Sequence, residues 1–117
     1  MNEESRQRVM RLLGLGIRSR GAIVGLEQVR AAARKGTVVF VAVAPDVSQN
    51  SLNKLVPLLE ARRISYTQDL SAEELGALAG RSTTAAIGVT DAQLARGIRE
   101  LVAGSRSGSP RGPNQGQ

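Results

Sequence analysis

The sequence contains no cysteine and no histidine among its 117 residues. Without cysteine there are no disulfide bonds and no thiolate metal sites. Without histidine, the side chain most often used as a general base and as a metal ligand is missing. Catalysis would depend on carboxylates alone, and each candidate fits a turn or helix-cap position better than a paired active site. These candidates are Asp46, Asp69, Glu73, Glu74 and Asp91. We therefore expect no metal, no cofactor and no enzymatic activity.

Aromatic residues and long apolar runs are also scarce. One Phe and one Tyr, with no Trp, are too few for a platform on which nucleic-acid bases stack. No run approaches the roughly 20 apolar residues that a membrane span needs. The first residues, 1–5, are acidic and polar, unlike a signal peptide. We predict a cytoplasmic protein with no membrane partner. The sequence also has no G-x-G-x-x-G motif after a predicted strand, so it carries no dinucleotide-binding fingerprint.

Positive charge is abundant and lies mainly in the first third of the chain. Residues 1–35 carry eight basic and three acidic residues, a net charge of +5, whereas residues 36–103 carry six and seven, a net charge of −1. A one-sided basic surface is typical of nucleic-acid binders. However, fourteen of the sixteen cations are Arg in a chain rich in Ala, Gly and Val, as a GC-rich genome would also produce. Composition alone leaves both interpretations open.

Helical and strand patterns alternate along the chain. Apolar side chains at helical spacing predict helices over 5–17, 25–35, 71–80 and 91–103, and a further helix that is capped by Ser48 or Asn50 and ends at Arg62 and Arg63. Apolar runs predict strands over 22–24, 37–43, 64–67 and 84–89. This alternation predicts an α/β fold, a three-layer α/β/α sandwich on a small mixed four-stranded sheet. We predict one domain over residues 1–103. Residues 104–117 have no large apolar side chain and are predicted to be a disordered polar tail.

Capping residues mark several helix starts. Ser5 is the predicted N-cap of the first helix. Ser71 and Glu74 match a capping box, in which the two residues satisfy each other's backbone N–H groups. Thr90 and Gln93 match a second box at the start of the last helix. These three positions predict where the first and the last two helices begin.

Residues 25–44 combine a helix start, a glycine stop and a buried strand. Gly25 opens the helix without a side chain, and Gly36 ends it directly after Arg34 and Lys35. Cations in the last turn followed by Gly are a normal C-terminal signature. Because the first N–H groups of a helix are free, a helix start held against a buried strand can bind phosphate. The sequence therefore offers an anion-binding corner at Gly25.

Seven segments carry a resemblance to a known family. They are Leu12–Gly16, Gly25–Gly36, Val38–Ala44, Leu55–Glu60, Ile64–Tyr66, Leu75–Gly80 and Ala85–Asp91. In their order and spacing, over residues 8–103, the chain resembles the L-seven-Ae type ribosomal protein superfamily, and it is most similar to the small bacterial members. The resemblance implies an α/β/α sandwich. Many members bind kink-turn RNA, so it also implies a structured RNA as the partner.

The resemblance also implies where RNA would bind. Family members use a Gly-Ala-Asn-Glu-x-x-Lys-like motif at the start of the second helix. Matched by position, Gly25 stands at the motif glycine, Leu26 at the small residue, Glu27 at the Asn, Gln28 at the Glu and Ala31 at the Lys. Gln28 can donate to a base edge, but an ionised Glu27 only accepts, and Ala31 supplies no cation. The same residues also fit an ordinary helix start, with Glu27 favourable against the helix dipole.

A second family contact is the loop before the last strand. Its counterparts here are Arg81, Ser82, Thr83 and Thr84. Arg18, Arg20, Arg30 and Arg81 could resupply positive charge near the altered motif. We therefore expect a non-catalytic, monomeric RNA-binding protein associated with the ribosome or with translation. The alternative is a protein–protein interaction module on the same scaffold with lost or altered RNA specificity, and a hydrolase using Asp46 is a third hypothesis.

Overall fold

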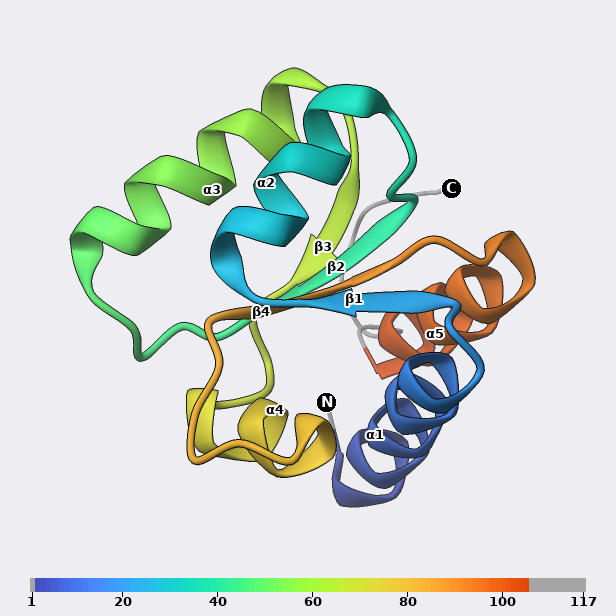
Figure 1. Cartoon of the computed structure of the whole chain (residues 1–117). Helices are drawn as coiled ribbons and strands as arrows, with labels where there is room; N and C mark the ends of the chain where they lie inside the picture. The colour runs from blue at the N-terminus through green and yellow to red at the C-terminus, as the bar shows by residue number, and fades with distance from the viewer. Residues whose placement is uncertain (1, 106–117) are drawn as a thin grey trace.

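The computed structural model describes residues 2–105, in which helices surround a central sheet (Figure 1). The helices are α1 (Glu3–Arg18), α2 (Leu26–Lys35), α3 (Gln49–Ala61), α4 (Ala72–Ala79) and α5 (Ala92–Ser105). The strands are β1 (Ala22–Val24), β2 (Phe40–Val43), β3 (Ser65–Thr67) and β4 (Ala86–Val89). Each predicted helix and strand is present, although the strands β2 and β4 are shorter than predicted.

The four strands form one mixed sheet in the order β1-β4-β2-β3. β4 runs antiparallel to both of its neighbours, whereas β2 and β3 are parallel. Every residue of the two central strands is buried, which explains why these segments read as continuous runs of small and β-branched residues. The predicted mixed four-stranded sheet is confirmed.

Helices cover both faces of the sheet, as Figure 1 shows. On one face, α2 and α3 pack a cluster that includes Val29, Leu55 and Leu59. On the other face, α1, α4 and α5 bury a larger cluster that includes Leu13 and Ile98. The apolar stripes seen in the sequence therefore point inward on each helix, and the predicted α/β/α sandwich is confirmed.

Two predicted helix caps are wrong. α1 begins at Glu3 because the Asn2 side chain, and not Ser5, is the cap; Asn2 accepts a hydrogen bond from the Ser5 N–H at 2.8 Å. At α5, the Asp91 carboxylate replaces Thr90 as the capping group and accepts from two backbone N–H groups at 2.8 and 3.0 Å. In both cases a side-chain carbonyl or carboxylate oxygen takes the place predicted for a hydroxyl.

The Ser71–Glu74 capping box is confirmed, with both reciprocal hydrogen bonds present. The last helix, α5, continues through residue 105. The rest of the predicted polar tail, residues 106–117, lies outside the described residues.

Tyr66 on β3 forms a titratable pair with Glu60 at the end of α3. The phenol donates to the Glu60 carboxylate at 2.7 Å, and this hydrogen bond, followed by burial and the carboxylate charge, raises the pKa of Tyr66. A phenol whose pKa is raised in the folded state stabilises the fold below its ordinary pKa of 10.0. This contribution disappears as the pH rises through the pKa of the folded state.

We predict that Glu60→Gln returns the Tyr66 pKa toward its ordinary value. The chain has one Tyr and no Trp, so phenolate absorbance reports this titration directly. An unchanged titration curve in the variant would contradict the assigned cause.

Candidate nucleic-acid interface

The start of α2 is built on the unusual backbone of Gly25. Its φ of 109° and ψ of 149° lie in a region that L side chains rarely adopt. The Gly25 N–H donates to the carbonyl of Ala86 on β4 at 2.9 Å, and its carbonyl accepts from the Val29 N–H at 3.0 Å. The turn into α2 is thus fixed to the start of β4. The positive φ therefore favours glycine at this position.

The first turn of α2 has no side-chain cap, because Gly25 provides none. Gln28 is exposed and folds back over the glycine: a Cβ placed on Gly25 would lie only 2.6 Å from its Oε1. The N–H groups of the first helical turn keep their capacity to bind an acceptor, since no capping side chain occupies them. The corner therefore combines backbone donors with a movable carboxamide.

The loop between α4 and β4 (residues 80–85) lies against this corner. Arg81 is exposed, and its guanidinium Nη1 lies 3.6 Å from the position that a Cβ on Gly25 would take. The Arg81 N–H donates to the carbonyl of Gly76 at 2.8 Å, which holds the start of the loop on α4. The structure thus brings the motif glycine, Gln28 and Arg81 together at one edge of the sheet, as Figure 1 shows for their elements.

Close backbone packing holds the middle of the same loop. A Cβ on Gly76 would lie 2.6 Å from the Cα of Thr83, closer than real side chains allow. The Thr84 N–H donates to the carbonyl of Ala72 at 3.0 Å, and Thr84 is buried with only 6% exposure. Ser82 and Thr83 are exposed at the loop tip. Thr84 is therefore an anchor of the loop, and the two preceding hydroxyls face solvent.

Glu27 and Arg30 neutralise each other on the surface of α2. Their carboxylate and guanidinium lie 2.8 Å apart, and the Arg30 Nε also donates to the carbonyl of Lys54 on α3 at 3.2 Å. The negative charge at the Asn position of the motif is thus compensated. Arg30 is directed toward α3 and adds no free charge at the corner. Leu26 is half-buried and packs against the core between α2 and α3.

Arg20 lies at the far end of β1 from Gly25. It occupies the turn after α1, with a φ of 65°. The carbonyl of the following residue, Gly21, accepts from the N–H groups of Thr90 and Asp91 at 2.9 and 3.2 Å, which places the turn beside the start of α5. Arg20 is therefore separated from the corner by the length of a strand.

Arg18 lies in the last turn of α1 and points back along the helix. Its Nη1 is 3.3 Å from the position of a Cβ on Gly14, in a shallow hollow shared with Met10 and Leu78. The four arginines that the sequence grouped together are consequently dispersed. Only Arg81 has its guanidinium directly at the corner.

Sequence reasoning missed the role of Gly76. A glycine inside a helical pattern signals close packing, but the sequence does not say against what. Across the described part of the chain, no group of three or more acidic residues is placed to hold a metal ion. Within the same part, no helix is long and apolar enough to cross a membrane.

The fold and this corner define a small α/β/α protein with a glycine-opened helix and an arginine-bearing loop at one sheet edge. Residues 7–102 match the model of the Ribosomal protein L7Ae/L30e/S12e/Gadd45 family, and the chain belongs to this family. It is 30% identical over 104 residues to the RNA-binding protein YlxQ of Enterococcus faecium, covering 89% of this chain and 100% of that protein. The predicted family and the similarity to its small bacterial members are confirmed.

Two solved structures share the fold. A protein of unknown function from Bacillus halodurans is 29% identical, with a TM-score of 0.75 over 81% of this chain and 96% of that chain. The 15.5kD RNA binding protein of Giardia lamblia is 19% identical, with a TM-score of 0.76 over 92% of each chain. At 19% identity the second likeness concerns the fold alone.

Proposed function

We propose that this chain is a non-enzymatic RNA-binding protein that recognises a structured, kink-turn-like RNA. The proposal is supported by the family and by the relative from Enterococcus faecium that is described as RNA-binding. The single observation that carries it is the corner in which Gly25, with its positive φ and uncapped helix start, lies against the Arg81 loop. Backbone donors and one guanidinium on a preformed surface suit an RNA bend with closely spaced phosphates.

Each corner residue has a distinct role in this proposal. Gly25 lets the RNA backbone approach the free N–H groups of α2, and Gln28 swings outward to a base edge. Arg81 binds a phosphate through its planar fork of N–H donors. Ser82 and Thr83 offer hydroxyls from the loop tip, and the buried Thr84 keeps the loop in place.

The remaining predicted residues act less directly. Leu26 and the Glu27–Arg30 pair hold α2 against α3, and the RNA meets only the outer surface of Glu27, whose side chain is 64% exposed. Arg18 adds positive charge only at a distance, from its place against Gly14 on α1, and Arg20 takes no part in this contact. We propose a monomeric cytoplasmic protein that associates with the ribosome or with translation. Within the described residues Leu15 is the one exposed large apolar side chain, which gives a stable dimer little to bury.

A comparison of two RNAs tests the proposal. The protein should bind a kink-turn hairpin more tightly than a straight duplex of equal length at low and at moderate salt. Arg81→Gln should weaken kink-turn binding by about 1–3 kcal/mol and lower the salt dependence by about one phosphate contact. Arg8→Gln, on the outer surface of α1, is the control and should leave the preference unchanged. Equal affinity for both RNAs, lost entirely at moderate salt, would reduce the claim to nonspecific attraction between charges.

One observation favours the alternative, a protein–protein interaction module. Glu27 forms an ion pair with Arg30, so the Arg30 charge is not available to RNA. Ala31 is exposed at the position where the RNA-binding members of the family carry a cation. The double change Glu27→Asn plus Ala31→Lys restores the family motif. If the parent chain ignores kink-turn RNA and the double variant binds it, the interaction module is the correct assignment. If both bind, RNA recognition has been retained.

A further inference from the structure

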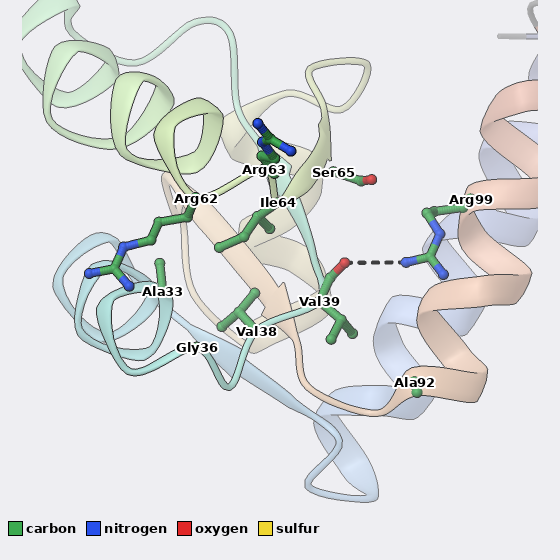
Figure 2. A pocket seen from close by; sticks show the side chains of 10 residues that line it. All are labelled: Ala33, Gly36, Val38, Val39, Arg62, Arg63, Ile64, Ser65, Ala92 and Arg99. Carbon is green, nitrogen blue, oxygen red and sulfur yellow. Dashed lines mark hydrogen bonds between the residues drawn. The ribbon is translucent and has the colours of Figure 1, made fainter.

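Five cations gather at the sheet edge opposite to the corner. This group, which we call the basic edge, consists of Arg34, Lys35, Arg62, Arg63 and Arg99. It surrounds the points where α2 and α3 end and where α5 passes the start of β2. A surface hollow of about 470 Å³ lies at its centre (Figure 2). Three of the arginines line this hollow over apolar residues that include Val38 and Ile64, and none of the described acidic residues lines it.

The strand directions place the basic edge away from the corner. β4 begins beside the Arg81 loop and pairs antiparallel with β2, so Ala86 faces Val43 at the end of β2. The basic edge instead surrounds the residues that lead into β2, including Val38 and Val39. Four paired residues, or roughly 13 Å of strand, separate the two surfaces along the sheet. One RNA phosphate cannot contact both.

The charges of the basic edge are not neutralised. Among the described residues, none of the five forms an ion pair, whereas Arg6, Arg8, Arg30 and Arg96 each do. Of the neighbouring carboxylates, Glu100 is paired with Arg96, whereas Glu60 accepts a hydrogen bond from the neutral Tyr66 hydroxyl and Asp91 caps α5, so these two keep their negative charge. The ends of α2 and α3 add about half a negative charge each. Five cations exceed the charges of Glu60, Asp91 and the two helix ends taken together, which leaves a net positive surface.

Two arginines flank the hollow on opposite sides. Figure 2 shows Arg62 extending from the end of α3 toward Ala33 on α2, and Arg99 extending from α5 toward Val39. The Arg99 Nη1 donates to the carbonyl of Val39 at 3.3 Å, which fixes the guanidinium at the rim. A guanidinium has five N–H donors, so four remain available to a ligand. The hollow is thus a preformed site for an anionic group.

Arg63 occupies a backbone position that would suit glycine better. Its φ is 58°, directly after the end of α3. The residues with positive φ that end α2 and α4 are Gly36 and Gly80, with φ of 77° and 73°. Keeping a side chain in this region costs about 1–2 kcal/mol. The substitution Arg63→Gly therefore removes a positive charge and also relieves the backbone strain. A loss of RNA binding in this variant would not result from destabilisation of the fold.

We propose that the basic edge binds the phosphate backbone of a second RNA segment, so that the protein bridges two RNA segments from opposite edges of its sheet. Four of the five cations are arginines, whose planar forks match phosphate oxygens. They are spread over three helices, which suits an extended polyanion better than one small anion. A protein partner would need an apolar anchor, and in the described residues the one large exposed apolar side chain, Leu15, lies on α1 away from this edge. Recognition of the second segment is independent of its base sequence, because contacts to phosphate oxygens carry no sequence information.

This inference goes beyond kink-turn recognition and is tested separately from it. The edge variant combines Arg62→Gln with Arg63→Gly, and the matched control combines Arg8→Gln with Arg11→Gln on α1. Both lose two positive charges. The protein is first saturated on an immobilised kink-turn hairpin, and a labelled straight RNA duplex is then offered in solution. The parent and the control should capture the duplex. The edge variant should bind the hairpin as the parent does but capture the duplex at least about tenfold less.

Salt titration supplies a second readout. Binding of the straight duplex to the free protein should lose about 1.8 units of salt slope in the edge variant, as expected for two phosphate contacts. An equal loss of salt slope in the edge variant and in the control would overturn the proposal. Tighter binding of polyglutamate than of RNA of the same charge would assign the basic edge to an acidic protein segment instead. If the hairpin is not bound at all but duplex binding still depends on Arg62 and Arg63, the kink-turn proposal fails and the basic edge stands.

Discussion

Replacing Gly76 with alanine is expected to destabilise the protein by about 2 kcal/mol, although alanine is normally the better residue in a helix. A Cβ at this position would lie 2.6–2.8 Å from backbone atoms of Ser82 and Thr83, which cannot rotate away as a side chain would. Overpacking of this kind costs about 3 kcal/mol at its upper range, and the gain in helix propensity returns up to about 1 kcal/mol. The loop must move outward, taking Arg81 away from Gly25. The midpoint of chemical denaturation, followed by circular dichroism, measures the loss.

Gly97→Ala provides the matched control for this result. Gly97 is also a helical glycine, but a Cβ there would meet only the Cδ1 atom of Leu12 at 3.5 Å, an ordinary contact. This variant should gain about 0.5–1 kcal/mol from helix propensity alone. Opposite signs for the two substitutions are the expected result. If Gly76→Ala also stabilises the protein, the loop does not pack on α4 as closely as the structure shows.

The loop displacement should have a functional consequence as well. The Gly76 variant should remain folded, since a loss of about 2 kcal/mol leaves part of a typical stability of 5–15 kcal/mol. Its preference for kink-turn RNA over a straight duplex should nevertheless fall, because the guanidinium of Arg81 no longer faces the start of α2. Capture of a second RNA at the basic edge should not change. The two proposed RNA surfaces are thereby separated by a substitution that alters no charge.

The architecture of this protein could be predicted from its sequence because local signals agreed with each other. Glycine stops such as Gly36 and the alternation of apolar patterns determined the order of helices and strands. The errors were at the helix starts, where Asp91 captures two N–H groups that were expected to be satisfied from Thr90. Two adjacent polar residues with similar capping preferences compete, and the sequence does not show which of them the turn geometry favours.

The candidate functional surfaces were only partly predictable. Gly25 was identified by its place before a helix, but its proximity to Arg81 depends on β1 pairing with β4, a contact between distant segments. Four arginines were expected near the corner, and the length of β1 keeps Arg20 away from it. The basic edge was hidden for a different reason. Residues 36–103 have a net charge of −1, which gave no hint that Arg62, Arg63 and Arg99 lie together around a hollow that none of the described acidic residues lines.

Replacing Gly25 with alanine is expected to weaken kink-turn RNA binding by at least about 30-fold. The φ of 109° at this position imposes strain of about 1–3 kcal/mol on any residue with a Cβ. The added methyl group would also lie 2.6 Å from the Gln28 Oε1 and 3.6 Å from the Arg81 guanidinium, so both groups must move. Gln28 is flexible, and its displacement is cheap for folding. For binding, however, the methyl group stands where the RNA backbone approaches the α2 N–H groups, and losing two contacts of about 1 kcal/mol each already gives this factor.

Gly36→Ala separates the effect on binding from the effect of backbone strain. Gly36 also has a positive φ, 77°, but no described atom lies within 4 Å of the position that a methyl group would take there, at the far end of α2. Both variants should lose about 1 kcal/mol or more of stability, measured by chemical denaturation. Only Gly25→Ala should lose affinity for the kink-turn hairpin, measured at the same salt and well below either unfolding midpoint. Parental affinity in the Gly25 variant would mean that RNA does not approach this corner, because a methyl group there cannot be accommodated beside a phosphate held by the helix start.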